Sequence, residues 1–166
     1  MRRAGAFLAA LVLLSPLAAA AASGEGWVQV AFAHPHPPYV VANEARALFA
    51  DVNATRIQHG LPVLAPDERL NELALAVARQ MADRHYFGHT DPNGVTFEAR
   101  LKAAGYRYHF AAENMALDAG EQRANAAFIN SPGHYRNIVD PHPHRLGVAV
   151  VAAGEGEVFY VEEFAD

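Results

Sequence analysis

The chain has 166 residues, carries 13 Lys plus Arg against 18 Asp plus Glu for a formal charge of −5, and contains no cysteine. This acidic balance disfavours nucleic acid as a partner and disfavours tight electrostatic binding to anionic membranes. Without cysteine the chain can form no disulfide and no thiolate metal site, so packing must hold it together and any metal would need nitrogen and oxygen ligands, for which its 9 histidines are candidates.

The first 22 residues have the pattern of a secretory signal peptide. Two arginines stand directly after the first residue, an uncharged stretch rich in leucine and alanine follows, and Ala20-Ala21-Ala22 fits the small-residue cleavage rule. An uncleaved membrane anchor is the alternative, but the alanine content and an internal proline favour cleavage. We therefore predict a signal peptide at 1–22 and a secreted or periplasmic protein with no stable membrane span after cleavage.

Residues 23–41 are predicted to form an extended leader rich in proline and histidine. The run His34-Pro35-His36-Pro37-Pro38 cannot be helical, because each proline restrains its own backbone and that of the residue before it. We expect a solvated, polyproline-like tether here. A single domain at 42–166 follows, which is long enough to bury a core.

Helical periodicity predicts, in chain order, helices at 42–59, at about 66–86, at 96–104 and at 121–130, with another helical turn at 134–139. Asp67 and Thr96 are suitable caps for the second and third helices, and we expect Gly88 to end the second. The predicted buried positions are Ala45, Leu48, Phe49, Val52 and Ile57 in the first helix, Leu70, Leu73, Ala74, Val77 and Met81 in the second, and Phe97, Leu101 and Ala104 in the third.

Strand signals dominate the rest of the chain. Residues 106–117 are predicted to carry one strand, and 146–153 and 158–165 two more, joined by the glycine-rich turn Gly154-Glu155-Gly156. Because the predicted helices come first along the chain and the antiparallel strands come last, we predict an α+β layered domain.

HYFGHTDPNG at 85–94 contains two histidines four residues apart. The zinc-protease helix signature requires Glu directly after the first histidine, but Tyr86 stands there, and Gly88 interrupts the helical face that would align the two rings. We therefore expect His85 to be an ordinary surface residue. His89 falls on a loop that a rigid scaffold can orient, which makes it the better candidate for a functional residue.

Two more candidates lie downstream. Glu113-Asn114 follows an apolar, strand-like run, and His134 follows Ser131-Pro132-Gly133. Two histidines and one carboxylate would suit a zinc-type site with an open position for water, although gaps of 24 and 21 residues match no local metal motif. The alternative is that His89, Glu113 and His134 hydrogen-bond one another and join helices to sheet. Asn114 is expected to brace the backbone.

Several segments, taken in order, resemble the bacterial, SCP-like branch of the CAP superfamily, which includes the cysteine-rich secretory proteins, antigen 5 and the plant pathogenesis-related class 1 proteins. These segments are NATRIQHGLPVL at 53–64, YFGHTDPNG at 86–94, FEARLKAAGY at 97–106, AENMA at 112–116, SPGHYRNI at 131–138, LGVAV at 146–150 and FYVEEFA at 159–165. The resemblance extends over about residues 42–165. It implies a three-layer α-β-α sandwich with a central antiparallel sheet.

The resemblance also implies a cleft lined by two histidines and two acidic residues. Carried over by position, His89 and His134 are the histidines and Glu113 is one acid. Phe128 and Ser131 stand near where animal and plant members have a tryptophan and the second acid. Three of the four cleft residues are therefore expected in this chain.

On this basis we expect an exported ligand- or metal-binding module whose partner is a small molecule, a lipid, a peptide or an envelope component. His89 and His134 would hold zinc or another divalent cation, and Glu113 and Asn114 would line the cleft. The alternative is a divalent-metal-dependent hydrolase, such as a protease, in which Glu113 is catalytic and activates a bound water. A third interpretation is a structural envelope domain with a vestigial site. The sequence leaves open whether the protein is an enzyme.

Overall fold

The computed structural model describes residues 8–12 and 26–166. The helices are α1 (Ala42–Gln58), α2 (Glu68–Arg84), α3 (Phe97–Ala103), α4 (Glu121–Asn130) and α5 (Pro132–Ile138). The strands are β1 (Leu8–Val12), β2 (Trp27–Gln29), β3 (Pro35–Val40), β4 (Ala65–Pro66), β5 (Tyr86–Gly88), β6 (Ala111–Asp118), β7 (Arg145–Gly154) and β8 (Glu157–Ala165).

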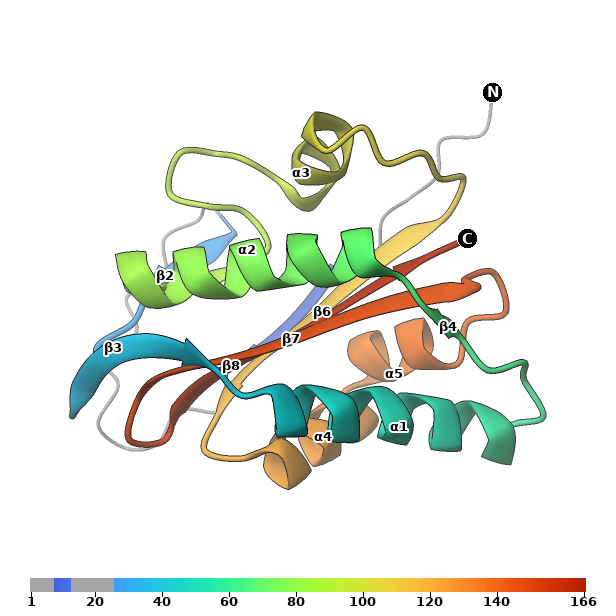
Figure 1. Cartoon of the computed structure of the whole chain (residues 1–166), viewed down its shortest axis with the longest axis horizontal. Helices are drawn as coiled ribbons and strands as arrows, with labels where there is room; N and C mark the ends of the chain where they lie inside the picture. Colours follow the sequence, from blue (N-terminus) through green and yellow to red (C-terminus); the bar gives the residue numbers. More distant parts are fainter. Residues whose placement is uncertain (1–7, 13–25) are drawn as a thin grey trace.

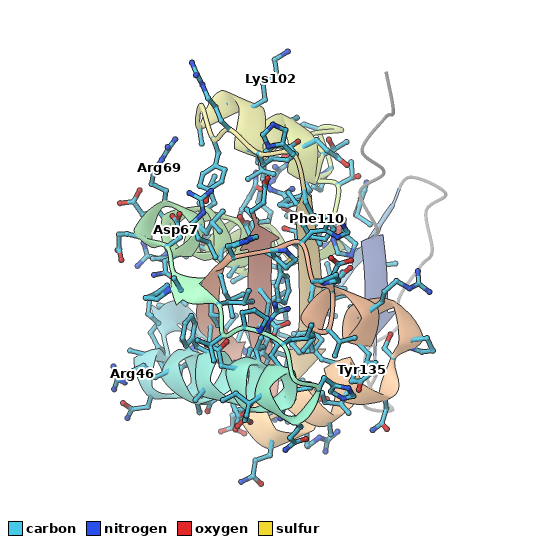
Figure 2. All side chains as sticks on the ribbon, turned by 90° about the vertical axis from the view of Figure 1, so that its right-hand side faces the viewer. Arg46, Asp67, Arg69, Lys102, Phe110 and Tyr135 are labelled. Carbon is cyan, nitrogen blue, oxygen red and sulfur yellow. The ribbon has the colours of Figure 1, made fainter. Side chains whose placement is uncertain are left out.

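A mixed sheet lies at the centre of the fold. Its strand order is β1-β6-β8-β7-β3, and β4 pairs with the start of β7. The contacts of β8 with β6 and β7, and of β3 with β7, are antiparallel, whereas β1 and β4 are parallel to their neighbours. Helices α2 and α3 cover one face, and α1, α4 and α5 cover the other (Figures 1 and 2). The α-β-α sandwich predicted from the sequence is confirmed.

Side chains of β6 and β8 alternate between the two faces, because successive residues of a strand point to opposite sides. Met115 and Val161 pack with α2, while Ala116 and Tyr160 pack with α1 and α4. The alternation fixes where polar side chains of these strands can point. Odd-numbered positions of β6 and β8 face α2 and α3, and even-numbered positions face α1, α4 and α5.

The segment expected to be a solvated tether lies in the sheet instead. Strand β3 pairs with β7, and Val41 N donates to Val150 O at 2.9 Å. Val30, just before it, is buried in the core. Its proline-rich sequence is extended, as expected, but extension here serves sheet pairing rather than a free linker.

Most of the predicted signal peptide lies outside the described residues. Its central part, Leu8–Val12, forms β1 and pairs with β6 along Glu113 to Leu117. Within residues 8–12 and 26–166, no helix is long and apolar enough to cross a membrane.

Helix α2 ends at Arg84, four residues before the predicted stop at Gly88. His85 adopts the left-handed conformation at φ 53° and closes the helix. Gly88 has another role: it lies in β5 against β2, where an added Cβ would be 2.4 Å from Gly26 O. Sequence reasoning correctly chose glycine as a special position here, but the constraint is close backbone packing and not helix termination.

Two predicted core positions are wrong. Ile57 is 63% exposed, and Ala104 is exposed as well. Arg56 is buried in place of Ile57, because its guanidinium donates to the carbonyl oxygens of Pro62, Ile138 and Asp140. A long cation with several backbone acceptors can occupy a core position that apolar periodicity would assign to a neighbour.

Candidate functional site

One buried carboxylate fixes the loop that carries His89. Asp91 is 2% exposed, and its Oδ1 accepts from two backbone N–H groups of its own turn, at 2.8 and 2.9 Å. Its Oδ2 accepts from Gln80 at 3.0 Å and from Arg84 at 3.1 Å, both on α2. The turn DPNG is thereby attached to α2. Because His89 lies only two residues before Asp91, its position is fixed as well.

His89 and Glu113 form a buried pair beside β6. The ring Nδ1 lies 2.8 Å from Glu113 Oε1, and the two residues are 6% and 0% exposed. A carboxylate only accepts hydrogen bonds, so Nδ1 is the donor. Arg100 donates to Glu113 Oε2 at 2.5 Å and to the backbone oxygen of His89 at 3.0 Å. Both carboxylate oxygens of Glu113 are therefore engaged, which suits a residue that orients His89.

A second carboxyl group lies beside Glu113. Glu163 of β8 is the cross-strand partner of Glu113, is 1% exposed and faces the same side of the sheet. Neither of its carboxyl oxygens has a hydrogen-bond partner among the described residues. Burial raises the pKa of Glu163 well above its usual range, the charge of Glu113 raises it further, and Arg100 acts in the opposite direction. The raised pKa favours the protonated form of Glu163.

A separate polar cluster occupies the opposite face of the sheet. Asn114 Nδ2 donates to Glu162 Oε2 at 2.9 Å and to the backbone oxygen of His134 at 3.2 Å, and its Oδ1 accepts from Asn137 at 2.8 Å. The His134 ring packs edge-on against Phe128, with 5.1 Å between ring centroids. Glu162 and His134 are both 0% exposed. Asn114 thus joins α5 to β6.

Burial raises the pKa of Glu162 to about 8. The hydrogen bond from Asn114 lowers the pKa, and the charge of Asp51 raises it. A neutral carboxylic acid is therefore the dominant form of Glu162 near pH 7.

The four predicted site residues form two hydrogen-bonded pairs and not one trio. His89 joins Glu113 on the α2 side, and Asn114 joins the carbonyl of His134 on the α5 side. Because Glu113 and Asn114 are consecutive in β6, the pairs lie on opposite faces of the same strand. His85 is exposed, and its ring stacks on Phe32 with 4.5 Å between centroids.

A closed zinc site usually takes four protein ligands, and a catalytic one three. His89 Nε2 offers one buried nitrogen that has no partner among the described residues. Across the part of the chain that the structure describes, however, no three His, Asp or Glu side chains come close enough together to hold an ion. The residues as placed do not fit a zinc centre.

The sequence interpretation missed Arg100, Asn137, Glu162 and Glu163. A signal for the last two exists in FYVEEFA, where two acids interrupt an apolar strand, so that one must point into each face of the sheet. Arg100 carries no such signal, because its approach to Glu113 from the short helix α3 follows only from the fold.

Most of the chain matches a known protein family. Residues 49–164 match the family described as CAP, "Cysteine-rich secretory protein family". The Bacillus subtilis (strain 168) "Uncharacterized protein YkwD" is 36% identical over 104 residues, which is 61% of this chain and 40% of that protein.

Two solved structures resemble most of this chain. One is an extracellular protein containing a SCP domain from Bacillus anthracis str. Ames, with 29% identity, a TM-score of 0.67 and coverage of 75% of this chain and 40% of that one. The other is an outer surface protein from Borrelia burgdorferi, with a TM-score of 0.73 and coverage of 80% and 98%; at 19% identity it shows likeness of fold alone. The chain thus spans less than half of YkwD and of the Bacillus anthracis protein.

Proposed function

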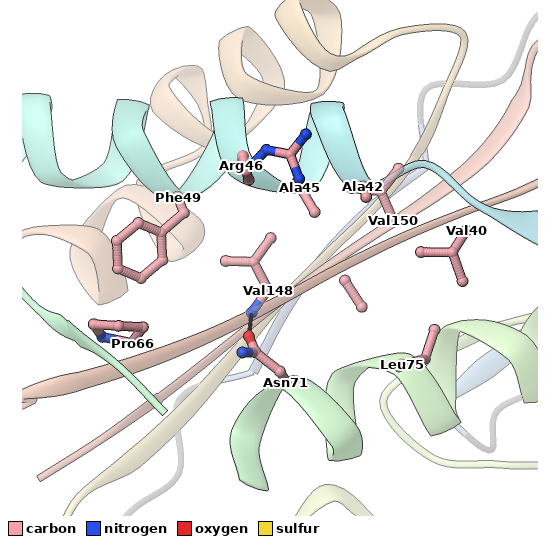
Figure 3. Close-up of a pocket in the computed structure, with 11 residues that line it drawn as sticks. Val40, Ala42, Ala45, Arg46, Phe49, Pro66, Asn71, Leu75, Val148 and Val150 are labelled. Atoms are coloured by element: carbon pink, nitrogen blue, oxygen red, sulfur yellow. Dashed lines mark hydrogen bonds between the residues drawn. The ribbon is translucent and has the colours of Figure 1, made fainter. Parts of the chain in front are cut away.

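Because the chain belongs to the cysteine-rich secretory protein (CAP) family, we propose that it acts outside the cytoplasm as a ligand-binding module with an apolar groove as its ligand site. The solved relatives named above are an extracellular protein and an outer surface protein, which supports export. The observation that carries the proposal is a groove of about 530 Å³ between α1, α2 and β7 (Figure 3). This volume is within the range of small-molecule sites.

The groove is almost entirely apolar. Nine of its eleven lining residues are aliphatic, aromatic or proline, namely Val40, Ala42, Ala45, Phe49, Pro66, Leu75, Val148, Ala149 and Val150. The other two are Arg46 and Asn71. None of the four residues expected to line a cleft is among them. An apolar ligand is favoured here by roughly 0.8 kcal/mol for each CH₂ group that it buries.

The groove exists because two neighbouring strands leave part of β7 uncovered. β3 pairs with β7 only as far as Val151, and β4 pairs only with its first residues. Between them, Val148 N donates to the side-chain oxygen of Asn71 at 2.9 Å, the dashed line in Figure 3. The Asn71 side chain thus accepts the hydrogen bond that a neighbouring strand would otherwise accept from Val148. Because no strand backbone lies there, space remains beside β7.

Arg46 supplies a charge at the rim. It is exposed on α1, hydrogen-bonds the Asn43 side chain, and forms no ion pair with a described carboxylate. A cation beside an apolar groove on an acidic protein is complementary to an anionic head group. We therefore assign the ligand as an amphiphile with one long apolar chain and a negatively charged head.

A fluorescent long-chain fatty acid and its methyl ester, titrated into the exported protein, test this assignment. Ala45→Trp should fill the groove and weaken binding of both probes at least about tenfold, whereas Ala47→Trp, on the exposed side of the same helix, should not. Arg46→Ala should weaken binding of the acid only. Equal binding of the acid to wild type and Ala45→Trp, with both proteins folded by circular dichroism, would refute the groove as the ligand site.

The metal-dependent hydrolase stays a separate prediction. The Nε2 of His89, which has no partner among the described residues, favours it. The hydrogen bonds from His89 and Arg100 to the two oxygens of Glu113 favour an orienting role for that residue over a base role. If a hydrolytic activity is found, Glu113→Gln tests the base role, because a Gln that leaves the rate unchanged excludes it.

A further inference from the structure

We propose that the edge of β6 is a docking site for an extended apolar peptide, closed in the full-length chain by its own residues 8–12 and open once residues 1–22 are removed. This proposal concerns a different edge of the sheet from the groove on β7. It rests on the predicted cleavage of the signal peptide and on the way β1 is seated.

Strand β1 is paired with β6 in parallel and without irregularity over five residues. Leu8 is opposite Glu113, Ala9 is opposite Asn114, and the pairing continues to Val12 opposite Leu117. Figure 1 shows this strand, blue in the sequence colours, along the outer side of β6, and Figure 2 shows the same neighbourhood from the side. Helix α5 contacts both β1 and β6. The edge therefore accepts an extended chain with its backbone hydrogen bonds in register.

Removal of β1 would leave β6 as the outermost strand of this side of the sheet. Every residue of β6, from Ala111 to Asp118, is buried in the full-length chain. An edge strand presents a row of backbone N–H and C=O groups that can pair with another strand, and unpaired groups in apolar surroundings are unfavourable. The vacated edge thus favours a new strand in the same place.

The chemistry of the occupant follows from what the edge already holds. The segment LAALV is uncharged, apolar and rich in small residues. Strand addition obtains affinity from main-chain hydrogen bonds and specificity from alternate side chains. We therefore assign the occupant as an extended segment of a partner protein with this apolar, small-residue character, parallel to β6.

The site lies directly over the polar residues described above. The first two pairs of the β1–β6 ladder involve Glu113 and Asn114, which hydrogen-bond the His89 ring and the His134 carbonyl. A docked peptide would place its backbone beside both polar pairs. In the full-length chain residues 8–12 cover this position, so the site would be available only in the cleaved protein.

The test uses the exported protein, with its N-terminus established by intact mass, and a lysine-flanked peptide with the sequence of residues 7–13. Two N-methylated versions carry the methyl groups either at the positions of Leu8, Ala10 and Val12 or at those of Ala9 and Leu11. Because successive backbone N–H groups of a strand point to opposite edges, only one set should weaken binding, by at least about tenfold. Hydrogen exchange should slow in residues 111–118 on peptide binding.

Four results would overturn the proposal. They are equal effects of the two methylated sets, unchanged exchange in β6, a dimer that already protects β6 without peptide, and an exported protein that retains residues 1–22. Ala45→Trp should bind the peptide as wild type does. Fatty-acid binding in the groove and peptide binding at β6 are therefore measured independently, so that either proposal can fail without the other.

Discussion

Glu162 offers the sharpest test of the buried polar network, because its carboxyl group is fully buried and only partly hydrogen-bonded. Oε2 accepts from Asn114 at 2.9 Å, and Oε1 has no partner among the described residues. Burial, first among the causes, raises the pKa of this group to about 8, from 4.5 in an exposed carboxyl. The perturbation is Glu162→Gln, which keeps the shape and an acceptor for Asn114 but cannot ionise.

The sign follows from proton linkage. Below pH 4.5 the carboxyl is protonated in both the folded and the unfolded chain, so ionisation has no effect on stability. Between pH 4.5 and 8 the unfolded chain loses the proton and the folded chain keeps it, so the free energy of unfolding falls by about 1.4 kcal/mol per pH unit. By pH 8 the wild type has lost about 5 kcal/mol from this group alone. The free energy of unfolding of Glu162→Gln should not fall in this way, because Gln does not ionise.

Urea unfolding at pH 4.5, 6, 7 and 8.5 measures the effect as the difference in free energy of unfolding between variant and wild type. Other titrating groups are common to both proteins and cancel in the difference. We expect a difference near zero or slightly negative at pH 4.5 that rises to about 5 kcal/mol in favour of the variant at pH 8.5. Glu155→Gln, exposed in the β7–β8 turn, should give a flat difference. A flat difference for Glu162→Gln too would show that the carboxyl is solvated or paired, and the reasoning would be wrong.

Three further changes test other parts of the site and fold. Arg100→Met should lower the free energy of unfolding by roughly 3 kcal/mol at pH 7, because it leaves the Glu113 carboxylate buried without its cation, whereas Arg79→Met, exposed on α2, should change it by less than about 0.5 kcal/mol. Gly88→Ala should destabilise by at least about 2 kcal/mol and alter the fluorescence of Trp27, the sole tryptophan, because the added Cβ would be 2.6 Å from Trp27 Cα; an unchanged spectrum would contradict the close packing of β2 on β5. Zinc titrated by calorimetry should bind wild type no tighter than the His89→Ala/His134→Ala double variant, and a wild-type affinity about tenfold or more above it would restore the metal interpretation.

The layers and most helices were predictable because local signals and packing agree there. Asp67 accepts from two N–H groups at the start of α2, Thr96 accepts from Ala99 N, and α4 begins and ends at the predicted residues. The strands β2 to β5 were not predictable from local pattern. β4 and β5 have two and three residues, too few to show alternation. β3 contains three prolines, which sequence rules exclude from central strands but permit at an edge.

The candidate site was predictable only in part, for a similar reason. Sequence context and family resemblance together gave His89, Glu113 and His134 as candidates. A residue that neutralises a buried charge, by contrast, is determined by the fold and can come from any element. On the α2 side, Arg100 from α3 reaches Glu113, and its charge also opposes the raised pKa of Glu163. On the α5 side, among the described residues, Glu162 has the neutral amide of Asn114 as its hydrogen-bond partner.

Two consecutive glutamates of one strand thus face different electrostatic surroundings. On the side that contains Arg100, the guanidinium donates to Glu113, and burial raises the pKa of the neighbouring Glu163. The other side has no such cation among the groups that shift the pKa of Glu162, so it stays neutral by retaining its proton. A rise in pH through about 8 should therefore perturb the α5 side, where Asn114 joins Glu162 to the His134 carbonyl. Hydrogen exchange in α5 should accelerate between pH 7 and 9 in wild type and not in Glu162→Gln, and equal acceleration in both proteins would place the sensitive group elsewhere.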